Sequence, residues 1–391
     1  VVLTRNVIGR ITTPPPLLPP PPHIRQLSSD ILPWNMSSKK LSSGHTVEAV
    51  EGEELEELKR LFPGQMIKNG LIRLQPNGWF FQSDYIKFGD KLYNFKLYPT
   101  DVILMTYPKC GTTWTQELIW TLRNNPDLNN PLADKPFEER VPFLEADSLG
   151  HSHLLDTMAS EGTNPQVELL SQVNPEADWR DGVNWQLAEA VQHPRTIKTH
   201  LPLELMPKDL LNTTKVVYVC RNPRDCIISW LHHNRLMKGM SFAGTLDQFI
   251  DLFLKEKWIY APYSTHINTA WKLRDNPNLL FLFYEDLKAD ILGQLKKLNN
   301  FLGTNRTEEQ LKNVASHSSF PEMRKRSYES KGLKVGQASD RYNKEVHDKD
   351  GGFFRKGETG DWKEKLTPAQ IATIDRYVQE KLPDFPFKYS V

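Results

Sequence analysis

The sequence is poor in cysteine and has almost no excess of either charge. Its 391 residues include three cysteines, Cys110, Cys220 and Cys226. Their small odd number and the lack of a Cys-x-x-Cys pair argue against a disulfide framework and against a metal site, and fit a reducing compartment. The 49 basic and 48 acidic side chains leave a net charge of +1. Because such a chain is not drawn as a whole to nucleic acid or to an acidic membrane, any anion site must be local.

Two further patterns are missing. No apolar run approaches the roughly 20 residues that cross a bilayer, so no membrane partner is expected. The sequence also lacks a Walker A loop, Gly-x-x-x-x-Gly-Lys followed by Ser or Thr. Here Lys109 precedes Gly111, and no glycine stands at the required distance before it. An ATPase or a nucleotide kinase is therefore disfavoured.

The sequence does contain a strand–loop–helix pattern around residues 106–114, Thr-Tyr-Pro-Lys-Cys-Gly-Thr-Thr-Trp. The apolar run at 102–105 predicts a buried strand before the loop, and apolar residues at helical spacing over 115–122 predict a helix after it. Gly111 lets the backbone approach a ligand closely, and the helix N-terminus offers free N–H groups to an anion. Taken alone, the loop fits an ordinary turn with a capping threonine equally well.

The ends of the chain differ in character. Seven prolines fall between positions 14 and 22, which predicts polyproline II or disorder for a tail over residues 1–50. Met36 is a plausible native start within that tail. We expect a single domain over 51–391, with a long surface insertion at about 144–192 and a polar lid at 330–352.

The domain is predicted to be of the α/β class. Buried strands are indicated by three apolar runs, at 101–107, 215–220 and 279–284, and a further strand is expected at 195–200. Segments of helical spacing alternate with them, at 246–258, 291–301 and 367–381. This alternation predicts a central parallel sheet flanked by helices, with ligands at the carboxyl ends of the strands. Before it we expect a helix at 51–62, and a strand and hairpin at 79–95 with its turn at Gly89 and Asp90.

Three predicted strands end at residues suited to anion binding or acid–base chemistry. Lys109 follows the first, His200 ends the second and Arg221 follows the third, so we expect them at one edge of the sheet. Each has an ordinary alternative when taken alone. A single histidine is usually structural, Arg221 and Arg224 would form local salt bridges, and the Arg355-Lys356-Gly357 stretch would be an exposed basic tip.

Five motifs in a fixed order make the pattern specific. They are Tyr-Pro-Lys-Cys-Gly-Thr-Thr-Trp, Lys-Thr-His-Leu-Pro, Arg-Asn-Pro-Arg-Asp with a downstream Ser, Phe-Tyr-Glu-Asp, and Arg-Lys-Gly-Glu-Thr-Gly-Asp-Trp-Lys. From about Phe62 to Phe387 the chain resembles the cytosolic sulfotransferase family. The resemblance implies a cytoplasmic enzyme that moves a sulfuryl group from 3′-phosphoadenosine 5′-phosphosulfate (PAPS) to a hydroxyl of a small lipophilic phenol, steroid, terpenoid or retinoid alcohol. The product nucleotide would be 3′-phosphoadenosine 5′-phosphate (PAP).

The resemblance also assigns roles to the matched positions. The 5′-phosphosulfate would be held by Lys109, Cys110, Gly111, Thr112 and Thr113. The 3′-phosphate would be held by Arg221, Ser229, Arg355, Lys356 and Gly357. The adenine would be surrounded by Trp114, Tyr284, Ser318 and Phe320. His200 would act as the general base, with Lys109 and Lys198 stabilising charge. Since lysines can supply that charge, no metal is expected.

Departures from the family pattern limit these assignments. Cys110 stands where Ser is commoner, which would slightly alter contact with the sulfate. The segment at 144–192 is longer than in common members and would cover the acceptor pocket, as in insect members such as retinol dehydratase. The dimerisation segment keeps Lys363 and Thr367 but has Pro368 and Ala372 where the family has Val and Glu, which leaves a homodimer open.

Two other functions stay open. One is an enzyme that uses sulfonation to eliminate water from an allylic alcohol. The other is a non-catalytic carrier of sulfonated nucleotides or lipophilic ligands, against which the retention of Lys109 and His200 argues. A stripe of aromatic residues is expected to be core or acceptor-pocket wall, with core favoured for each, namely Phe249, Phe253, Trp258, Tyr260 and Tyr263.

Overall fold

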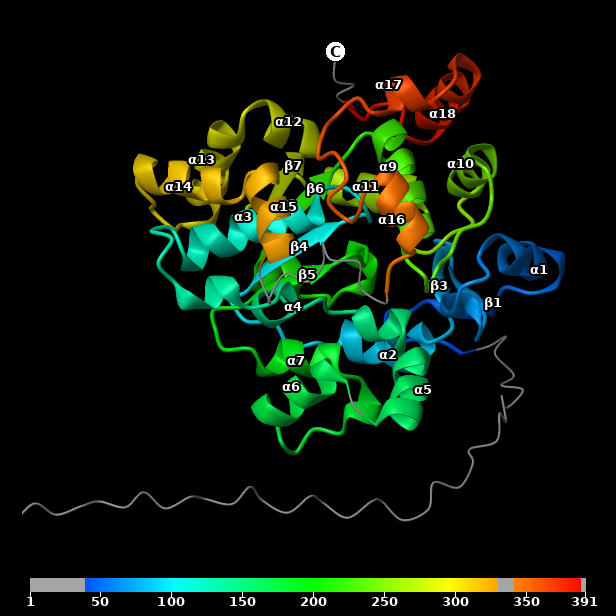
Figure 1. Ribbon diagram of the computed structural model, residues 1–391, viewed down its shortest axis with the longest axis horizontal. Coiled ribbons are helices and arrows are strands. Elements are labelled where there is room, and N and C mark those ends of the chain that lie inside the picture. Colours follow the sequence, from blue (N-terminus) through cyan, green and yellow to red (C-terminus); the bar gives the residue numbers. More distant parts are fainter. Residues whose placement is uncertain (1–38, 163, 330–340, 388–391) are drawn as a thin grey trace, which may run out of the picture. The chain divides into compact units, whose positions relative to one another are not determined.

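A computed structural model describes residues 39–162, 164–329 and 341–387. Within them lie a four-stranded parallel sheet and a three-stranded antiparallel sheet (Figure 1). The parallel sheet has the order β5-β4-β6-β7. Its strands are β4 (Val102–Thr106), β5 (Thr196–Thr199), β6 (Lys215–Cys220) and β7 (Leu279–Phe283). They lie within the four segments predicted to be strands, which confirms the α/β class and the parallel central sheet.

Both faces of the parallel sheet are covered by helices. Leu104 and Val217 face a cluster with α3 (Thr112–Asn124), α13 (Ile291–Leu302) and α14 (Glu308–His317). Alternate strand residues face the other cluster, with α9 (Pro223–Leu236) and α11 (Tyr263–Lys272). Helices on both faces explain why β4, β6 and β7 read as nearly continuous apolar runs instead of alternating ones, whereas β5, Thr-Ile-Lys-Thr, is mostly polar.

The antiparallel sheet begins before the expected domain boundary. It consists of β1 (Thr46–Ala49), β2 (Leu71–Gln75) and β3 (Trp79–Gln82). Thr46 pairs with Gln75, so the boundary at residue 50 is wrong: the folded part includes this strand. The proline-rich stretch and Met36 lie outside the described residues.

The hairpin predicted around Gly89 and Asp90 is also wrong, because these residues lie inside a helix, α2 (Tyr85–Tyr93). Tyr85, Phe88 and Leu92 recur at helical spacing and are buried on one face of it. A side chain on Gly89 would come within 2.8 Å of the Tyr85 ring. The glycine is thus needed for packing and does not mark a turn.

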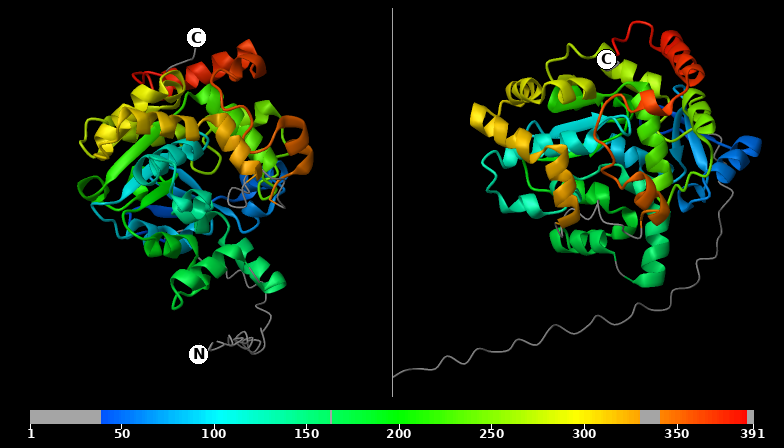
Figure 2. Two further views of the ribbon diagram at one scale, coloured as in Figure 1. Left: turned by 60° about the vertical axis from the view of Figure 1, so that its left-hand side comes forward. Right: turned by 45° about the horizontal axis from the view of Figure 1, so that its top comes forward.

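The segment at 144–192 is largely helical and is anchored in the core. It holds α5 (His151–Glu161), α6 (Pro165–Val173) and α7 (Asn184–Ala190), which lie together beside α2 (Figures 1 and 2). Asp147 is buried, and its carboxylate accepts hydrogen bonds from the N–H groups of Val183, Asn184 and Trp185 at 2.8–3.0 Å. The insertion expected at 144–192 thus contains three α-helices, and the start of α7 is tied to the buried carboxylate of Asp147.

The remaining helices complete the layers around both sheets. They are α1 (Gly52–Leu61), α4 (Phe137–Arg140), α8 (Leu210–Thr213), α10 (Leu246–Leu254), α12 (Tyr284–Ala289), α15 (Phe320–Glu329), α16 (Lys344–Asp350), α17 (Trp362–Lys365) and α18 (Pro368–Lys381). Of the predicted lid at 330–352, residues 330–340 lie outside the described residues and α16 occupies most of the rest. Within the described ranges, no helix has both the length and the apolar character needed to span a bilayer.

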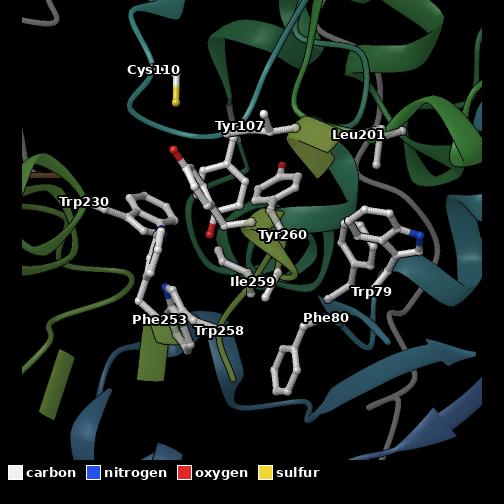
Figure 3. Close-up of a cluster of buried hydrophobic side chains, with 14 of the residues drawn as sticks. Trp79, Phe80, Tyr107, Cys110, Leu201, Trp230, Phe253, Trp258, Ile259 and Tyr260 are labelled. Carbon is white, nitrogen blue, oxygen red and sulfur yellow. The ribbon is translucent and has the colours of Figure 1, made fainter. Parts of the chain in front are cut away.

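The two sheets are joined through an aromatic core. Phe80 of β3 exchanges backbone hydrogen bonds with the segment at 260–261, because its N–H donates to Ala261 and its carbonyl accepts from Tyr260, at 2.9 and 2.7 Å. Figure 3 shows Trp79 and Phe80 on one side of Tyr260, and Trp258, Phe253 and Trp230 on the other. The antiparallel sheet thus fixes the position of Tyr260.

Candidate active site

One pocket lies at the carboxyl ends of β4, β5 and β6. Lys109 reaches it from the loop after β4, Lys198 and His200 from the end of β5, and Arg221 from the turn after β6. The expectation that three strands bring cationic and acid–base groups to one edge is confirmed. The other predicted residues that line the pocket are Gly111, Thr112, Thr113, Trp114, Ser229, Tyr284, Phe320, Arg355, Lys356 and Gly357.

Two predicted residues do not line this pocket. Cys110 is fully buried, and its Sγ lies 4.0 Å from the Sγ of Cys226, pointing into the core instead of toward an anion. Its side chain is thus part of the core instead of the pocket lining. Ser318 is also buried, but its carbonyl accepts a hydrogen bond of 2.8 Å from the indole N–H of Trp114. It acts on the pocket through that tryptophan.

The loop after β4 is shaped by Gly111, which precedes α3. Its φ of +99° lies in the left-handed region, and a side chain there would come within 2.5 Å of the Tyr284 ring. Only glycine meets both demands. With the backbone held this way, the first N–H groups of α3 open toward the pocket, and Thr112 and Thr113 line it beside them.

Lys109 is a buried cation among other cations. Burial, followed by repulsion from Arg221, lowers its pKa from 10.5 to about 7. Its Nζ lies 4.8 Å from the centre of the Phe353 ring and 3.4 Å from Nδ1 of His233. In the described part of the chain it has no carboxylate partner. An anion entering the pocket would therefore stabilise its charged form.

His200 is held as a neutral imidazole with one free nitrogen. Its Nδ1 lies 2.8 Å from the carbonyl oxygen of Thr106. Because a carbonyl only accepts, Nδ1 carries the proton and Nε2 keeps a lone pair. Burial and the charge of Lys198 lower the pKa of His200 to about 3. The imidazole is thus neutral at neutral pH, with its single ring proton on Nδ1, and it lines the pocket.

The backbone of His200 is fixed by two buried groups. Its N–H donates to Oε1 of Glu145 at 2.6 Å, and its carbonyl lies 3.0 Å from Nε2 of His266. Glu145 also accepts from the hydroxyls of Thr199, at 2.8 Å, and Tyr260, at 3.2 Å. These contacts hold the imidazole in one orientation toward the pocket.

The cationic side of the pocket is lined by Arg221 and by the segment at 351–361. Arg221 donates to the carbonyl of Glu358 at 2.9 Å, and its guanidinium lies over the Tyr284 ring at 4.5 Å. Its Nε is buried without a hydrogen-bond partner, which leaves a donor available for an anion. Arg355 pairs with Asp361 at 2.7 Å, and Lys356 contacts the same carboxylate.

Arg224 has the ordinary role that the sequence allowed for it. Its guanidinium forms a bidentate pair with Asp375 at 2.6 and 2.7 Å and lies over the Trp362 ring at 4.3 Å. The neighbouring Arg221 faces the pocket instead. Of the two arginines in this turn, Arg224 therefore forms a structural ion pair and Arg221 belongs to the site.

The opposite wall of the pocket is largely apolar. It is formed by Phe143, Leu149, Trp230, Met240, Ile259 and Tyr260. Of the aromatic stripe, Tyr260 thus lines the pocket, while Phe249, Phe253, Trp258 and Tyr263 are core. Leu149, at the end of a short 3-10 helix, is the one described residue of 144–192 among the lining residues.

Comparisons with known proteins show which family the chain that carries this pocket belongs to. A family model described as "Sulfotransferase domain" matches residues 99–386. The chain belongs to the sulfotransferase family. Rat sulfotransferase 1A1 is 31% identical over 76% of the chain and 90% of its own length, and luciferin sulfotransferase of Photinus pyralis is 29% identical over 78% and 77%. A solved structure of retinol dehydratase with retinol and PAP is 28% identical, with a TM-score of 0.71 over 88% of the chain and 98% of its own.

Sequence reasoning missed several residues of this sulfotransferase site. Glu145, His266 and His233 contact catalytic candidates from 55, 66 and 124 positions away in the chain, and no local spacing signals such contacts. A partial signal exists for Glu145, because it follows the apolar stretch at 141–144. Among the described residues, no cluster of three or more His, Cys, Asp and Glu side chains is arranged to hold a metal ion.

Proposed function

We propose that this sulfotransferase uses PAPS as its donor and a hydroxyl of a small lipophilic molecule as its acceptor. The observation that carries the proposal is that a buried lysine and a neutral histidine line one pocket beside an apolar wall. Among the described residues the lysine has no carboxylate partner and Nε2 of the histidine has no hydrogen-bond partner. The lysine suits an anion, the histidine suits a hydroxyl, and the apolar wall suits the body of the acceptor. PAP in the related retinol dehydratase structure supports this donor.

The donor would be divided among three parts of the pocket. The N-terminus of α3 with Thr112 and Thr113 would hold the 5′-phosphosulfate. Arg221, Ser229 and the Arg355-Lys356-Gly357 segment would hold the 3′-phosphate, with Arg355 turning from Asp361 to the phosphate. Trp114 and Phe320 would enclose the adenine together with Tyr284, while Ser318 would position Trp114.

The transfer itself requires positioning and charge stabilisation. The acceptor oxygen would form a bond to sulfur as the bond from sulfur to the bridging oxygen breaks. Nε2 of His200 would take the acceptor proton, and Lys109 would stabilise the charge that develops on the bridging oxygen. Lys198, whose Nζ lies 4.3 Å from the centre of the Phe143 ring, would stabilise charge on the transferred group from the acceptor side.

A transfer assay tests the donor and the acceptor class together. The protein is incubated with ³⁵S-labelled PAPS and a panel of phenols, steroids, terpenoid alcohols and retinoids, and organic-phase label is counted. Label in at least one product, lost when Lys109 is changed to Met, is the expected result. If no member of the panel is labelled while PAP binds, the chain acts as a carrier of nucleotides instead.

A second candidate is favoured by the similarity to retinol dehydratase. An allylic acceptor would first receive the sulfuryl group and then lose sulfate and a proton, giving a dehydrated hydrocarbon. Mass spectrometry of the products separates the two outcomes, because a sulfate ester gains the mass of SO₃ and a dehydrated product loses that of water. A retinoid that gives only the ester excludes this second candidate for that acceptor.

A further inference from the structure

The ammonium of Lys109 has one side-chain hydrogen-bond partner in the described chain, and it is a histidine. Nδ1 of His233, on α9, lies 3.4 Å from Nζ of Lys109. The His233 ring stacks on Trp230, with a centroid distance of 5.4 Å and an angle of 26° between the planes. The Phe353 ring contacts His233 edge-on, with centroids 6.0 Å apart, and its centre lies 4.8 Å from the lysine nitrogen. The imidazole is thus held in place by rings on its own helix and on the facing segment.

The surroundings of Lys109 make this contact important. A buried ammonium needs hydrogen-bond acceptors or negative charge to stay protonated. The groups that face it from neighbouring elements supply mainly positive charge or none. They are Lys198 and His200 at β5, Arg221 before α9, Cys226 and His232 on α9, and Arg355 in the segment before α17. Of the side chains around the ammonium, only His233 places an acceptor within hydrogen-bond distance of it in the described chain.

The chemistry of the contact fixes the state of the histidine. An ammonium only donates, so Nδ1 of His233 must accept and its Nε2 must carry the proton. Burial and the charge of Lys109 hold the pKa of His233 well below its ordinary value. The imidazole is thus neutral throughout the range in which Lys109 titrates, and it can act as an acceptor across that range.

We propose that His233 is a positioning residue for Lys109, whose Nδ1 accepts a hydrogen bond from the ammonium and keeps it charged and directed into the pocket before a nucleotide binds. The importance of this for catalysis rests on the proposed function, in which Lys109 meets the bridging oxygen of the donor. The contact itself is a property of the chain alone. It can therefore be tested without turnover.

The test compares two replacements that separate the acceptor from the ring. His233→Asn keeps an oxygen near the position of Nδ1, whereas His233→Phe keeps a ring and removes the acceptor. His45→Asn is the control, because its histidine contacts Ser43 and Asn77 away from the pocket. The protein is labelled with ¹³C and ¹⁵N at lysine, and the Lys109 resonance, assigned from its loss in Lys109→Arg, is followed by NMR from pH 5 to 10. Melting temperatures establish that the variants are folded.

Loss of the acceptor should lower the pKa of Lys109 in His233→Phe by about one unit, a tenfold change in the ratio of ammonium to amine. His233→Asn and His45→Asn should stay within about 0.3 of a unit of wild type, which is below a twofold change in that ratio. Calorimetric titration with PAP at pH 8 should show affinity about tenfold weaker in His233→Phe, for the same reason.

Three results would overturn the proposal: an unchanged Lys109 midpoint in His233→Phe, an equal fall in His233→Asn, or an equal fall in His45→Asn. Failure of the proposed function looks different. In that case wild type transfers no label, whether or not it binds PAP, while the Lys109 midpoints still decide the role of His233.

Discussion

The buried carboxyl of Glu145 gives a prediction whose size follows from the structure. Burial raises the pKa of Glu145 from 4.5 to about 7. The carboxyl is fully buried behind His200, so no solvent correction applies. In the unfolded chain it ionises near its ordinary value, whereas in the folded chain it stays protonated until about pH 7. Its contribution to stability is therefore fully present below pH 4.5 and is lost as the pH rises through 7.

The magnitude follows from the two pKa values. At about 1.4 kcal/mol for each pH unit between them, the ionisation of Glu145 lowers the free energy of unfolding by about 3 kcal/mol between pH 4.5 and 8. Glu145→Gln removes the titration and keeps the shape. The free energy of unfolding of Glu145→Gln minus that of wild type should therefore increase by about 3 kcal/mol as the pH rises. Urea denaturation at intervals from pH 5 to 8 measures the difference.

The comparison cancels the titration of every other group, because only one side chain changes. Glu53→Gln, at an exposed position of α1, is the matched control and should give a flat difference. A difference between Glu145→Gln and wild type that is constant within about 0.5 kcal/mol over this range would refute the reasoning. It would mean that the hydrogen bonds from His200, Thr199 and Tyr260 keep the carboxylate ionised at all these pH values.

Three further predictions concern the site itself. His200→Ala should lower turnover by about 10²–10⁴-fold while PAP still binds. A label-transfer assay measures the turnover and a calorimetric titration measures the PAP affinity. Near-wild-type turnover with a good acceptor would show that His200 is not the general base. Arg355→Ala should weaken PAP binding at least about tenfold, since a guanidinium–phosphate contact is lost. Its control, Arg224→Ala, should lower the melting temperature instead. Equal PAP affinities in Arg355→Ala and wild type would take Arg355 out of the phosphate site. Gly111→Ala should abolish PAP binding, because the side chain meets Tyr284 at 2.5 Å and the φ of +99° is strained; retained binding would show that the loop adapts.

The sequence predicted the parts of the structure that depend on local patterns. Strands β4, β6 and β7 lie between helices on both faces, so their apolar runs are nearly unbroken and their positions are readable from the sequence. The helix α2 was misread because Gly89 and Asp90 resemble a turn, and only the packing of Gly89 against Tyr85 explains the glycine. A glycine that is needed for helix packing and a glycine that marks a turn look the same in the sequence.

In the candidate site, too, local patterns predicted some residues and could not predict the contacts between distant segments. Lys109, His200 and Arg221 were predictable because each ends a strand and parallel strands align their ends. The contacts of Glu145 with His200 and of His233 with Lys109 were not, since they join distant segments whose approach is set by the packed helices. The side-chain direction of Cys110 was also beyond the sequence, because it depends on the contact with Cys226 across the loop.

The hydrogen bonds between Phe80 and the segment at 260–261 have a consequence for how this chain can be divided. The family model begins at residue 99, yet the antiparallel sheet that supports Tyr260 is formed by residues 46–82. Phe62 also stacks on Trp258, with ring centroids 3.4 Å apart. A fragment cut to the matched region would keep the loop after β4 and lose the support of the apolar wall. The position of the apolar wall therefore depends in part on residues 46–82, although no described residue of that stretch lines the pocket itself.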